Sequence, residues 1–387
     1  MMMAQEETTA TKRQKKFITS IETLTSAPTS IPTLPFDLVA EILCRLPVNL
    51  LLQLRYLCKS FNSLISDPKF AKKHLRMSAP RHHLMVGSRN KLYNKLCLLD
   101  SPLPSVFSTS RRVKLTLTEL NYPVSLNNGH RLMVCSCDGI LCINATRHAI
   151  LWNPSFRNFK ILPPLEFEWE YNAIPVYSFG YDRFIDSYKI IVVSNCHRIK
   201  GKIEVAVHSL GTNYWRRIDD IPFSGWIPEW GSGIFVSGSG TINWLVFDIS
   251  NILLTSIVSL DLEKESYQML SQPDLKGNTC KKSLGMLSDC LCFFDSKDSV
   301  YFDIWIMKEY GNRESWTKLY RLPPMKNHVT PYTKVLYMSE DDRIMVNYND
   351  SGVVVYDYKK GTLKIPRFET KIQLMAPNVY IESLISP

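Results

Sequence analysis

A pattern of short apolar runs repeats along most of the chain, and this repeat constrains the fold more than any other feature of the sequence. Each unit holds two strongly apolar runs, followed a few residues later by a run that contains an aromatic or leucine residue. The repeat has a period of roughly 40–55 residues, which is in the range of propeller blades. The five units span Cys137–Pro163, Tyr188–Ile218, Gly240–Leu270, Cys290–Leu319 and Arg343–Ile365.

The segment from Arg81 to Leu120 supplies a sixth, less regular unit, so we predict a β-propeller with six blades. A four-stranded blade has two apolar faces and must stack on its neighbours. Tryptophans in the repeat fill the space between such blades, namely Trp152, Trp215, Trp244, Trp305 and Trp316. A propeller with five or seven blades and an irregular β-sandwich remain alternatives.

A helical segment, from Ile31 to Leu75, precedes the repeat. Its apolar side chains recur at helical spacing. Proline is tolerated at Pro35 in a first helical turn, and Pro47 ends that helix, so we predict three short helices. A unit of this size cannot bury all of its own leucines, so another domain or protein must cover part of its surface. The predicted fold class is an α+β multidomain protein, with a small N-terminal helical module before an all-β domain.

The composition along the chain indicates where the domains are expected to begin and end. Residues 1–30 are rich in Thr and Ser and are predicted to form a disordered tail. The helical module spans residues 31–76, and the β domain spans residues 77–387.

The distribution of charge and the lack of targeting signals indicate which partners and which cell compartment to expect for this chain. The net charge of +10 arises before residue 123, because residues 123–387 carry equal numbers of basic and acidic side chains. A nucleic-acid-binding domain is expected to carry a basic patch, so we expect no nucleic-acid partner.

Neither a long apolar span nor a secretory signal is present, which predicts no membrane association. We expect the cytoplasm and/or the nucleus, where thiols stay reduced. The basic run Lys12–Lys16 fits a nuclear localisation signal, although such runs are also common on flexible tails.

The sequence contains no motif of a known catalytic or metal site. Walker, nucleophile-elbow, zinc-protease and dinucleotide-binding motifs are missing. Cysteines lie close together at Cys135, Cys137 and Cys142, but the C-x₂-C spacing of structural zinc sites is absent. We therefore predict no catalytic residue, no metal and no cofactor.

The helical segment resembles an F-box, the module that docks a substrate receptor on the Skp-type adaptor of a cullin-RING ubiquitin ligase. The resemblance is carried by Leu34-Pro35, Leu38, Glu41-Ile42-Leu43, Arg45-Leu46-Pro47-Val48, Leu54-Arg55, Cys58-Lys59-Ser60, Asn62 and Leu64-Ile65. The family usually has Trp at Phe61 and often Lys at Asn49. The resemblance implies that one apolar face of this segment binds the adaptor, and that the adaptor connects the chain to the cullin and RING subunits. Its members are Leu34, Pro35, Leu38, Ile42, Leu43, Leu46, Pro47, Leu50, Leu54 and Cys58.

The β domain resembles the plant F-box-associated domain. The matching segments include Trp152–Ser155, Phe179–Asp182, Val207–Thr212, Asp303–Gly311 and Tyr380–Leu384. The resemblance implies a protein substrate, but members of this class recognise different targets, so it does not identify that substrate.

Two aromatic loops are candidates for binding the target, because exposed Trp and Tyr residues often anchor interfaces. Their candidate residues are Trp169, Tyr171, Trp226 and Trp230. The alternative is that these side chains pack under neighbouring blades as local cores.

Three functions are compatible with the sequence. The leading hypothesis is the substrate-recognition subunit of an SCF-type ubiquitin ligase, a receptor that is not itself an enzyme. The second is an F-box protein that sequesters its partner without degradation. The third is a propeller enzyme, which the lack of paired acids or a metal cluster disfavours.

Overall fold

The computed structural model describes residues 34–90, 95–108, 114–122, 132, 134–145, 148–165, 175–196, 201–228, 231–251, 253–275, 279–297, 301–323, 332–348, 352–368 and 374–387. The chain forms two compact units, Met1–Cys44 and Arg45–Pro387. The predicted tail, residues 1–30, lies outside the described residues.

Four short helices precede the first strand in the described residues, where the sequence predicted three. They are α2 (Phe36–Leu43), α3 (Val48–Leu54), α4 (Lys59–Ser66) and α5 (Pro68–Met77). Pro35 and Pro47 are the N-cap residues of α2 and α3. The additional helix, α5, has Pro68 at its first position, and the Asp67 carboxylate caps it by accepting a hydrogen bond from the Lys69 amide at 2.8 Å. This local start signal separates α5 from α4.

After α5, the helices and strands of the described residues are all β-strands, apart from the short helix α6 (Leu103–Phe107) and the 3₁₀ turn η1 (Arg313–Ser315). The strands are β1 (His82–Asn90), β2 (Lys95–Pro102), β3 (Thr118–Leu120), β4 (Val134–Cys137), β5 (Ile140–Ala145), β6 (His148–Asn153), β7 (Asn158–Ile161), β8 (Val176–Asp182), β9 (Ser187–Cys196), β10 (Lys202–Ser209), β11 (Arg216–Arg217), β12 (Ile234–Val236), β13 (Thr241–Phe247), β14 (Thr255–Asp261), β15 (Tyr267–Leu270), β16 (Thr279–Leu287), β17 (Cys290–Lys297), β18 (Tyr301–Met307), β19 (Trp316–Leu322), β20 (Tyr332–Met338), β21 (Arg343–Tyr348), β22 (Gly352–Asp357), β23 (Thr362–Lys364) and β24 (Leu374–Ile381).

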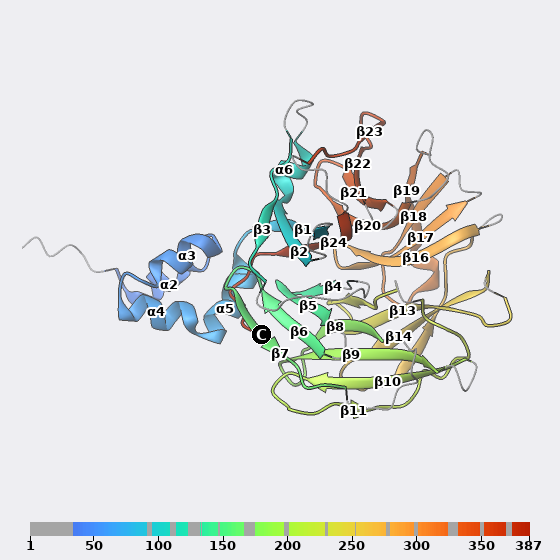
Figure 1. Ribbon diagram of the computed structural model, residues 1–387, viewed down its shortest axis with the longest axis horizontal. Coiled ribbons are helices and arrows are strands. Elements are labelled where there is room, and N and C mark those ends of the chain that lie inside the picture. The colour runs from blue at the N-terminus through green and yellow to red at the C-terminus, as the bar shows by residue number, and fades with distance from the viewer. Residues whose placement is uncertain are drawn as a thin grey trace, which may run out of the picture. The chain divides into compact units, whose positions relative to one another are not determined.

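These strands form six four-stranded antiparallel sheets, which are the blades of a propeller (Figure 1). Five blades run in chain order from β4–β7 to β20–β23. The sixth blade has the order β24-β1-β2-β3, so the last strand of the chain completes the sheet that the first strands begin. We call it the closing blade. The predicted fold class, a helical module followed by a six-bladed β-propeller, is confirmed.

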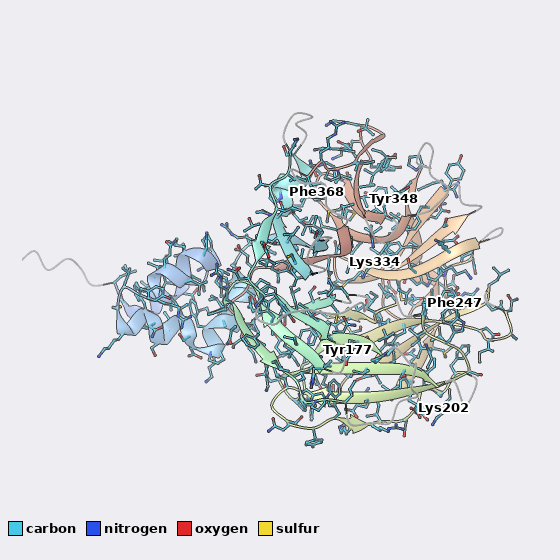
Figure 2. The ribbon with its side chains drawn as sticks, in the orientation of Figure 1. Tyr177, Lys202, Phe247, Lys334, Tyr348 and Phe368 are labelled. Carbon is cyan, nitrogen blue, oxygen red and sulfur yellow. The ribbon has the colours of Figure 1, made fainter. Side chains whose placement is uncertain are left out.

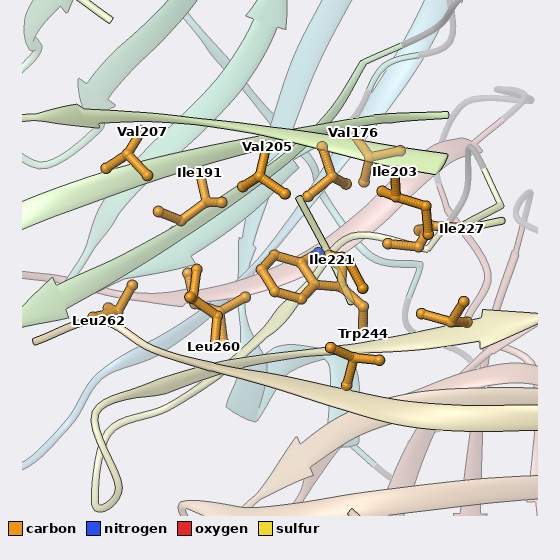
Figure 3. Close-up of a cluster of buried hydrophobic side chains, with 14 residues drawn as sticks. Val176, Ile191, Ile203, Val205, Val207, Ile221, Ile227, Trp244, Leu260 and Leu262 are labelled. Carbon is orange, nitrogen blue, oxygen red and sulfur yellow. The ribbon is translucent and has the colours of Figure 1, made fainter. Parts of the chain in front are cut away.

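Buried side chains join each blade to the next. Figure 3 shows the cluster between the β8–β11 and β12–β15 blades, where Trp244 packs against Ile191, Val205 and Leu260. The Trp244 indole Nε1 donates a hydrogen bond to Ser178 Oγ at 3.1 Å, so its polar group is satisfied within the interface. The apolar area and the directed bond together fix the position of one blade on the other.

The remaining junctions complete a ring of blades. Apolar clusters join β12–β15 to β16–β19, β16–β19 to β20–β23, β20–β23 to the closing blade, and the closing blade to β4–β7. Between the β4–β7 and β8–β11 blades, the Tyr188 hydroxyl donates to Asp138 Oδ2 at 2.9 Å. Every blade therefore has two blade neighbours, as a closed propeller requires.

The antiparallel topology defines two faces of the propeller. The turns from the innermost strand of each blade to its second strand lie on one face, together with the start of β1. We call this the entry face, because the chain enters the propeller there. Asp138 and Gly139 form one such turn, and their φ angles of 51° and 82° match a two-residue hairpin turn. The connections from the second to the third strand, and from one blade to the next, lie on the opposite face, which we call the rim.

Candidate partner-binding surfaces

The first unit presents apolar side chains to solvent on α2 and just before it. Leu34, Leu38 and Ile42 are 50%, 51% and 54% exposed, and Pro35 is also exposed. Large apolar side chains with this exposure are typical of a surface that a partner covers. Leu43 is the buried member of the predicted adaptor-binding set within this unit.

The predicted adaptor-binding residues of the second unit are partly accessible. Leu50 and Cys58 are exposed, whereas Leu46, Pro47 and Leu54 are half-buried. The structure also exposes residues that the sequence did not single out as binding residues. Among them, Tyr56 and Leu57 are 92% and 69% exposed, between α3 and α4. Leu57 fits the helical spacing of apolar residues in this segment, but no sequence signal marked Tyr56 as accessible.

Hydrogen bonds hold the helices of this unit in place. The His74 Nε2 atom of α5 donates to the Leu46 carbonyl just before α3, at 2.8 Å. Burial lowers the pKa of His74, so the neutral imidazole is favoured there. The Arg55 Nε atom donates to Asn62 Oδ1 at 3.2 Å, which joins the end of α3 to α4. The first bond fixes the chain at Leu46, and the second holds α4 at the end of α3.

The entry face of the propeller contacts α5. The Lys72 ammonium of α5 lies 2.5 Å from Asp186 Oδ2, in the turn between β8 and β9, and donates to the Tyr181 hydroxyl at 3.5 Å. Target binding at the entry face would therefore compete for space with α5, whereas the rim has no such neighbour among the described residues of this unit.

Part of the rim is apolar. Trp226 is half-buried and packs on Phe247, the last residue of β13, with ring centroids 5.2 Å apart. Figure 2 labels Phe247. The loop that follows β13 exposes Ile249, Leu253 and Leu254 by 44%, 59% and 58%. We call these five residues the rim patch. Trp226 thus packs against its own propeller, and it borders an exposed apolar surface.

A lysine from the next blade supports the rim patch. The Lys282 ammonium of β16 donates to the Leu253 carbonyl at 2.8 Å and to Thr255 Oγ1 at 3.2 Å. Burial lowers the pKa of Lys282. The bond across the blade junction holds the exposed leucines in a defined loop. The other predicted target residues, Trp169, Tyr171 and Trp230, lie outside the described residues.

The described residues hold no group of three His, Cys, Asp or Glu side chains placed to bind a metal ion. Within the same part of the chain, no helix is long and apolar enough to cross a membrane.

Comparison with known families accounts for both parts of the chain. The F-box domain model matches residues 31–73, and the F-box associated beta propeller domain model matches residues 93–386. The chain belongs to the F-box associated beta propeller family. The F-box implies binding to a Skp-type adaptor, and the two domains together support a role as an F-box substrate adaptor.

Known proteins of Arabidopsis thaliana are similar over nearly the whole chain. An F-box/kelch-repeat protein is 26% identical over 368 residues, covering 92% of this chain and 96% of its own. F-box protein CPR1 is 26% identical over 386 residues, and the match covers 91% of this chain and 89% of CPR1. Among solved structures, the six-bladed lectin of Aleuria aurantia is 9% identical with a TM-score of 0.46, covering 74% of this chain and 91% of the lectin.

Proposed function

We propose that this F-box protein is the substrate-recognition subunit of an SCF-type ubiquitin ligase. The observation that supports the proposal most strongly is the exposed apolar surface of α2, within the segment that matches the F-box domain. Burial of Leu38 and Ile42 by a Skp-type adaptor would remove this surface from water and drive the association. Cullin and RING subunits would then join through the adaptor.

The propeller would hold the protein target at its rim. The entry face contacts α5 of the same unit, and the rim patch offers exposed apolar side chains on loops fixed by neighbouring blades. In this role the chain supplies no catalytic group. It raises the effective concentration of a target lysine near the ubiquitin thioester carried by a conjugating enzyme. We propose the cytoplasm and/or the nucleus as its location.

A capture experiment with a degradation readout tests this function. The tagged full-length chain is expressed in its native tissue beside Leu38→Ala/Ile42→Ala, and the captured proteins are identified. We expect the adaptor and cullin with the wild type and their loss from the double variant, while target candidates are retained by both. The half-life of a retained target should lengthen in cells that express the double variant.

Two results would contradict the proposal. Absence of adaptor and cullin from the wild-type capture would show that the F-box is not used. An unchanged target half-life, with the adaptor still bound by the wild type, would instead favour a protein that sequesters its partner without degradation.

A further inference from the structure

Two cysteines face each other across the innermost hairpin of one blade. Cys135 of β4 lies directly opposite Cys142 of β5 in the antiparallel register. Directly opposed residues have Cα atoms about 4.5–5.5 Å apart, which falls within the range of about 4.4–6.8 Å found for disulfides. Both side chains also point to the same face of the hairpin. Other described strand cysteines lack this arrangement: Cys97 lies opposite Ser88, and Cys290 lies opposite Leu287.

The thiol of Cys135 contacts two backbone carbonyl oxygens, and one of them belongs to Cys142. The Cys135 Sγ atom lies 3.9 Å from the Cys142 carbonyl oxygen and 4.0 Å from the Tyr177 carbonyl oxygen of the next blade. A hydrogen bond between the two side chains, together with burial, raises the pKa of Cys142, because the bond stabilises the protonated Cys142 thiol that donates it. The opposed register and this bond place the two side chains next to each other in the reduced protein.

Only one of the two thiols has access to small solutes. Cys135 is half-buried and lines a cavity of about 120 Å³, whereas Cys142 is only 1% exposed. Residues of all six innermost strands line this cavity, including Lys334 of β20, which Figure 2 labels. One water molecule occupies about 30 Å³ of liquid, so the cavity has room for a small peroxide.

We propose that Cys135 and Cys142 form an oxidative modification site, at which hydrogen peroxide or a small organic hydroperoxide converts the two thiols into an intramolecular disulfide. The Cys135 sulfur attacks a peroxide oxygen and becomes a sulfenic acid, and water or an alcohol leaves. The Cys142 sulfur then attacks the sulfenic sulfur. The S–S bond forms, hydroxide leaves and takes the Cys142 proton, and a molecule of water is released. Two thiols are oxidised and one peroxide is reduced.

The disulfide would alter the junction between two blades. In the reduced protein, the Cys135 thiol approaches the Tyr177 carbonyl of β8 across the junction between the β4–β7 and β8–β11 blades. A disulfide has no S–H donor, so this contact is lost on oxidation. Hydrogen exchange in β4 and β8 should therefore increase in the oxidised protein.

Mass spectrometry on the folded full-length chain tests the site. The protein is treated with graded hydrogen peroxide, the remaining thiols are alkylated, and the peptides are analysed without reduction. We expect a disulfide between Cys135 and Cys142, which dithiothreitol should reduce. In Cys142→Ser the link should be absent and dimedone should label a sulfenic acid at Cys135. The matched control Cys97→Ser should form the link as the wild type does.

The unfolded chain provides a second control that needs no substitution. Cys137 is nearer than Cys135 to Cys142 in sequence, so in urea it should compete for the link, whereas the folded register excludes it. Links through Cys137 in the folded protein, or oxidation of Cys135 without a link to Cys142, would overturn the proposal. The same would follow if folded and unfolded chains gave the same pattern of links.

Discussion

At the scale of single residues, the side chain of Asn153 holds the C-terminal tail on the propeller. Asn153 is fully buried, and its Nδ2 atom donates to the carbonyl oxygens of Ser383 at 3.1 Å and Ile385 at 2.7 Å. Its Oδ1 atom accepts a hydrogen bond from the Ser155 amide at 2.8 Å. The Asn within the Trp-Asn-Pro-Ser segment thus has a structural role that its sequence context did not reveal.

We expect Asn153→Ala to lower the free energy of unfolding by about 2–3 kcal/mol, because buried carbonyl groups lose their donor. Urea denaturation measures the change, and hydrogen exchange should increase in residues 383–387. The control is Asn158→Ala, which removes only an exposed bond to Ser386 Oγ. Equal effects of the two substitutions would show that the tail does not depend on Asn153.

A histidine links the two ends of the closing blade. His83 of β1 contacts Asp100 of β2 at 2.9 Å through Nδ1, and Glu382 at 3.2 Å through Nε2. The Tyr380 hydroxyl also donates to Asp100 at 3.0 Å. Burial alone would lower the pKa of His83, but the bonds to the two carboxylates outweigh burial and raise it to about 9. His82 beside it has a lowered pKa because of burial and the charge of His83.

The raised pKa makes the contribution of His83 to stability depend on pH. The charged imidazolium stabilises the fold fully below pH 6.5, the ordinary pKa, and this contribution is lost as the pH rises through about 9. We expect His83→Gln to cost about 2–3 kcal/mol at pH 6 and much less at pH 10. Urea denaturation of both proteins at the two pH values measures this difference. A cost that does not change with pH would contradict the assignment.

At the scale of elements, the repeat in the sequence predicts three strands of each blade and misses the innermost strand. The unit Cys137–Pro163 corresponds to β5, β6 and β7, while β4 largely precedes it. β4 and β12 are only 4 and 3 residues long, so even an apolar run such as Ile234–Val236 is too short to be recognised as a strand. Arg81–Leu120 was correctly expected to form a blade, but a local repeat cannot reveal that β24 joins it from the other end of the chain.

A buried ion pair also joins two of these elements. The Lys189 ammonium of β9 is 2.7 Å from Asp182 Oδ2 of β8 and 3.0 Å from Glu265 Oε1 of the next blade. The Lys189 and Asp182 side chains are only 6% and 1% exposed. Removal of one partner from such a pair leaves an uncompensated buried charge.

We therefore expect Lys189→Met to lower the free energy of unfolding by about 3–5 kcal/mol. Lys264→Met is the control, because Lys264 forms a solvent-exposed pair with Asp261 at 4.0 Å and should change stability by less than about 0.5 kcal/mol. Thermal or urea denaturation compares the two variants. The assignment would fail if Lys189→Met were as stable as Lys264→Met.

At the scale of the whole molecule, closure of the ring depends on the last strand. β24 pairs with β1 and contributes the buried Tyr380 to the junction with the β4–β7 blade. We expect removal of residues 374–387 to abolish the cooperative unfolding transition, because the closing blade loses its innermost strand and leaves an open edge. Calorimetry of the shortened chain would detect this, and a sharp transition like that of the full chain would contradict it.

The sequence could predict those residues of the candidate binding surfaces that belong to a local pattern, such as the apolar spacing of one helix. The apolar spacing around Leu38 and Ile42 is a property of one helix, so the sequence identified these residues, and the structure exposes them. Accessibility at the rim depends on how distant loops pack. The sequence therefore suggested Trp226 but could not reveal its contact with Phe247 or the exposed leucines beside it.

The affinity of the purified full-length chain for a Skp-type adaptor tests the central claim most directly. Isothermal titration calorimetry compares Leu38→Ala/Ile42→Ala with the wild type and with the control Phe159→Ala/Ile161→Ala. The control side chains, on the outer strand β7, are comparably exposed at 42% and 50%. We predict that the wild type and control bind alike and that Leu38→Ala/Ile42→Ala binds about a hundredfold more weakly. Failure of the wild type to bind, or equal binding by all three proteins, would contradict the account.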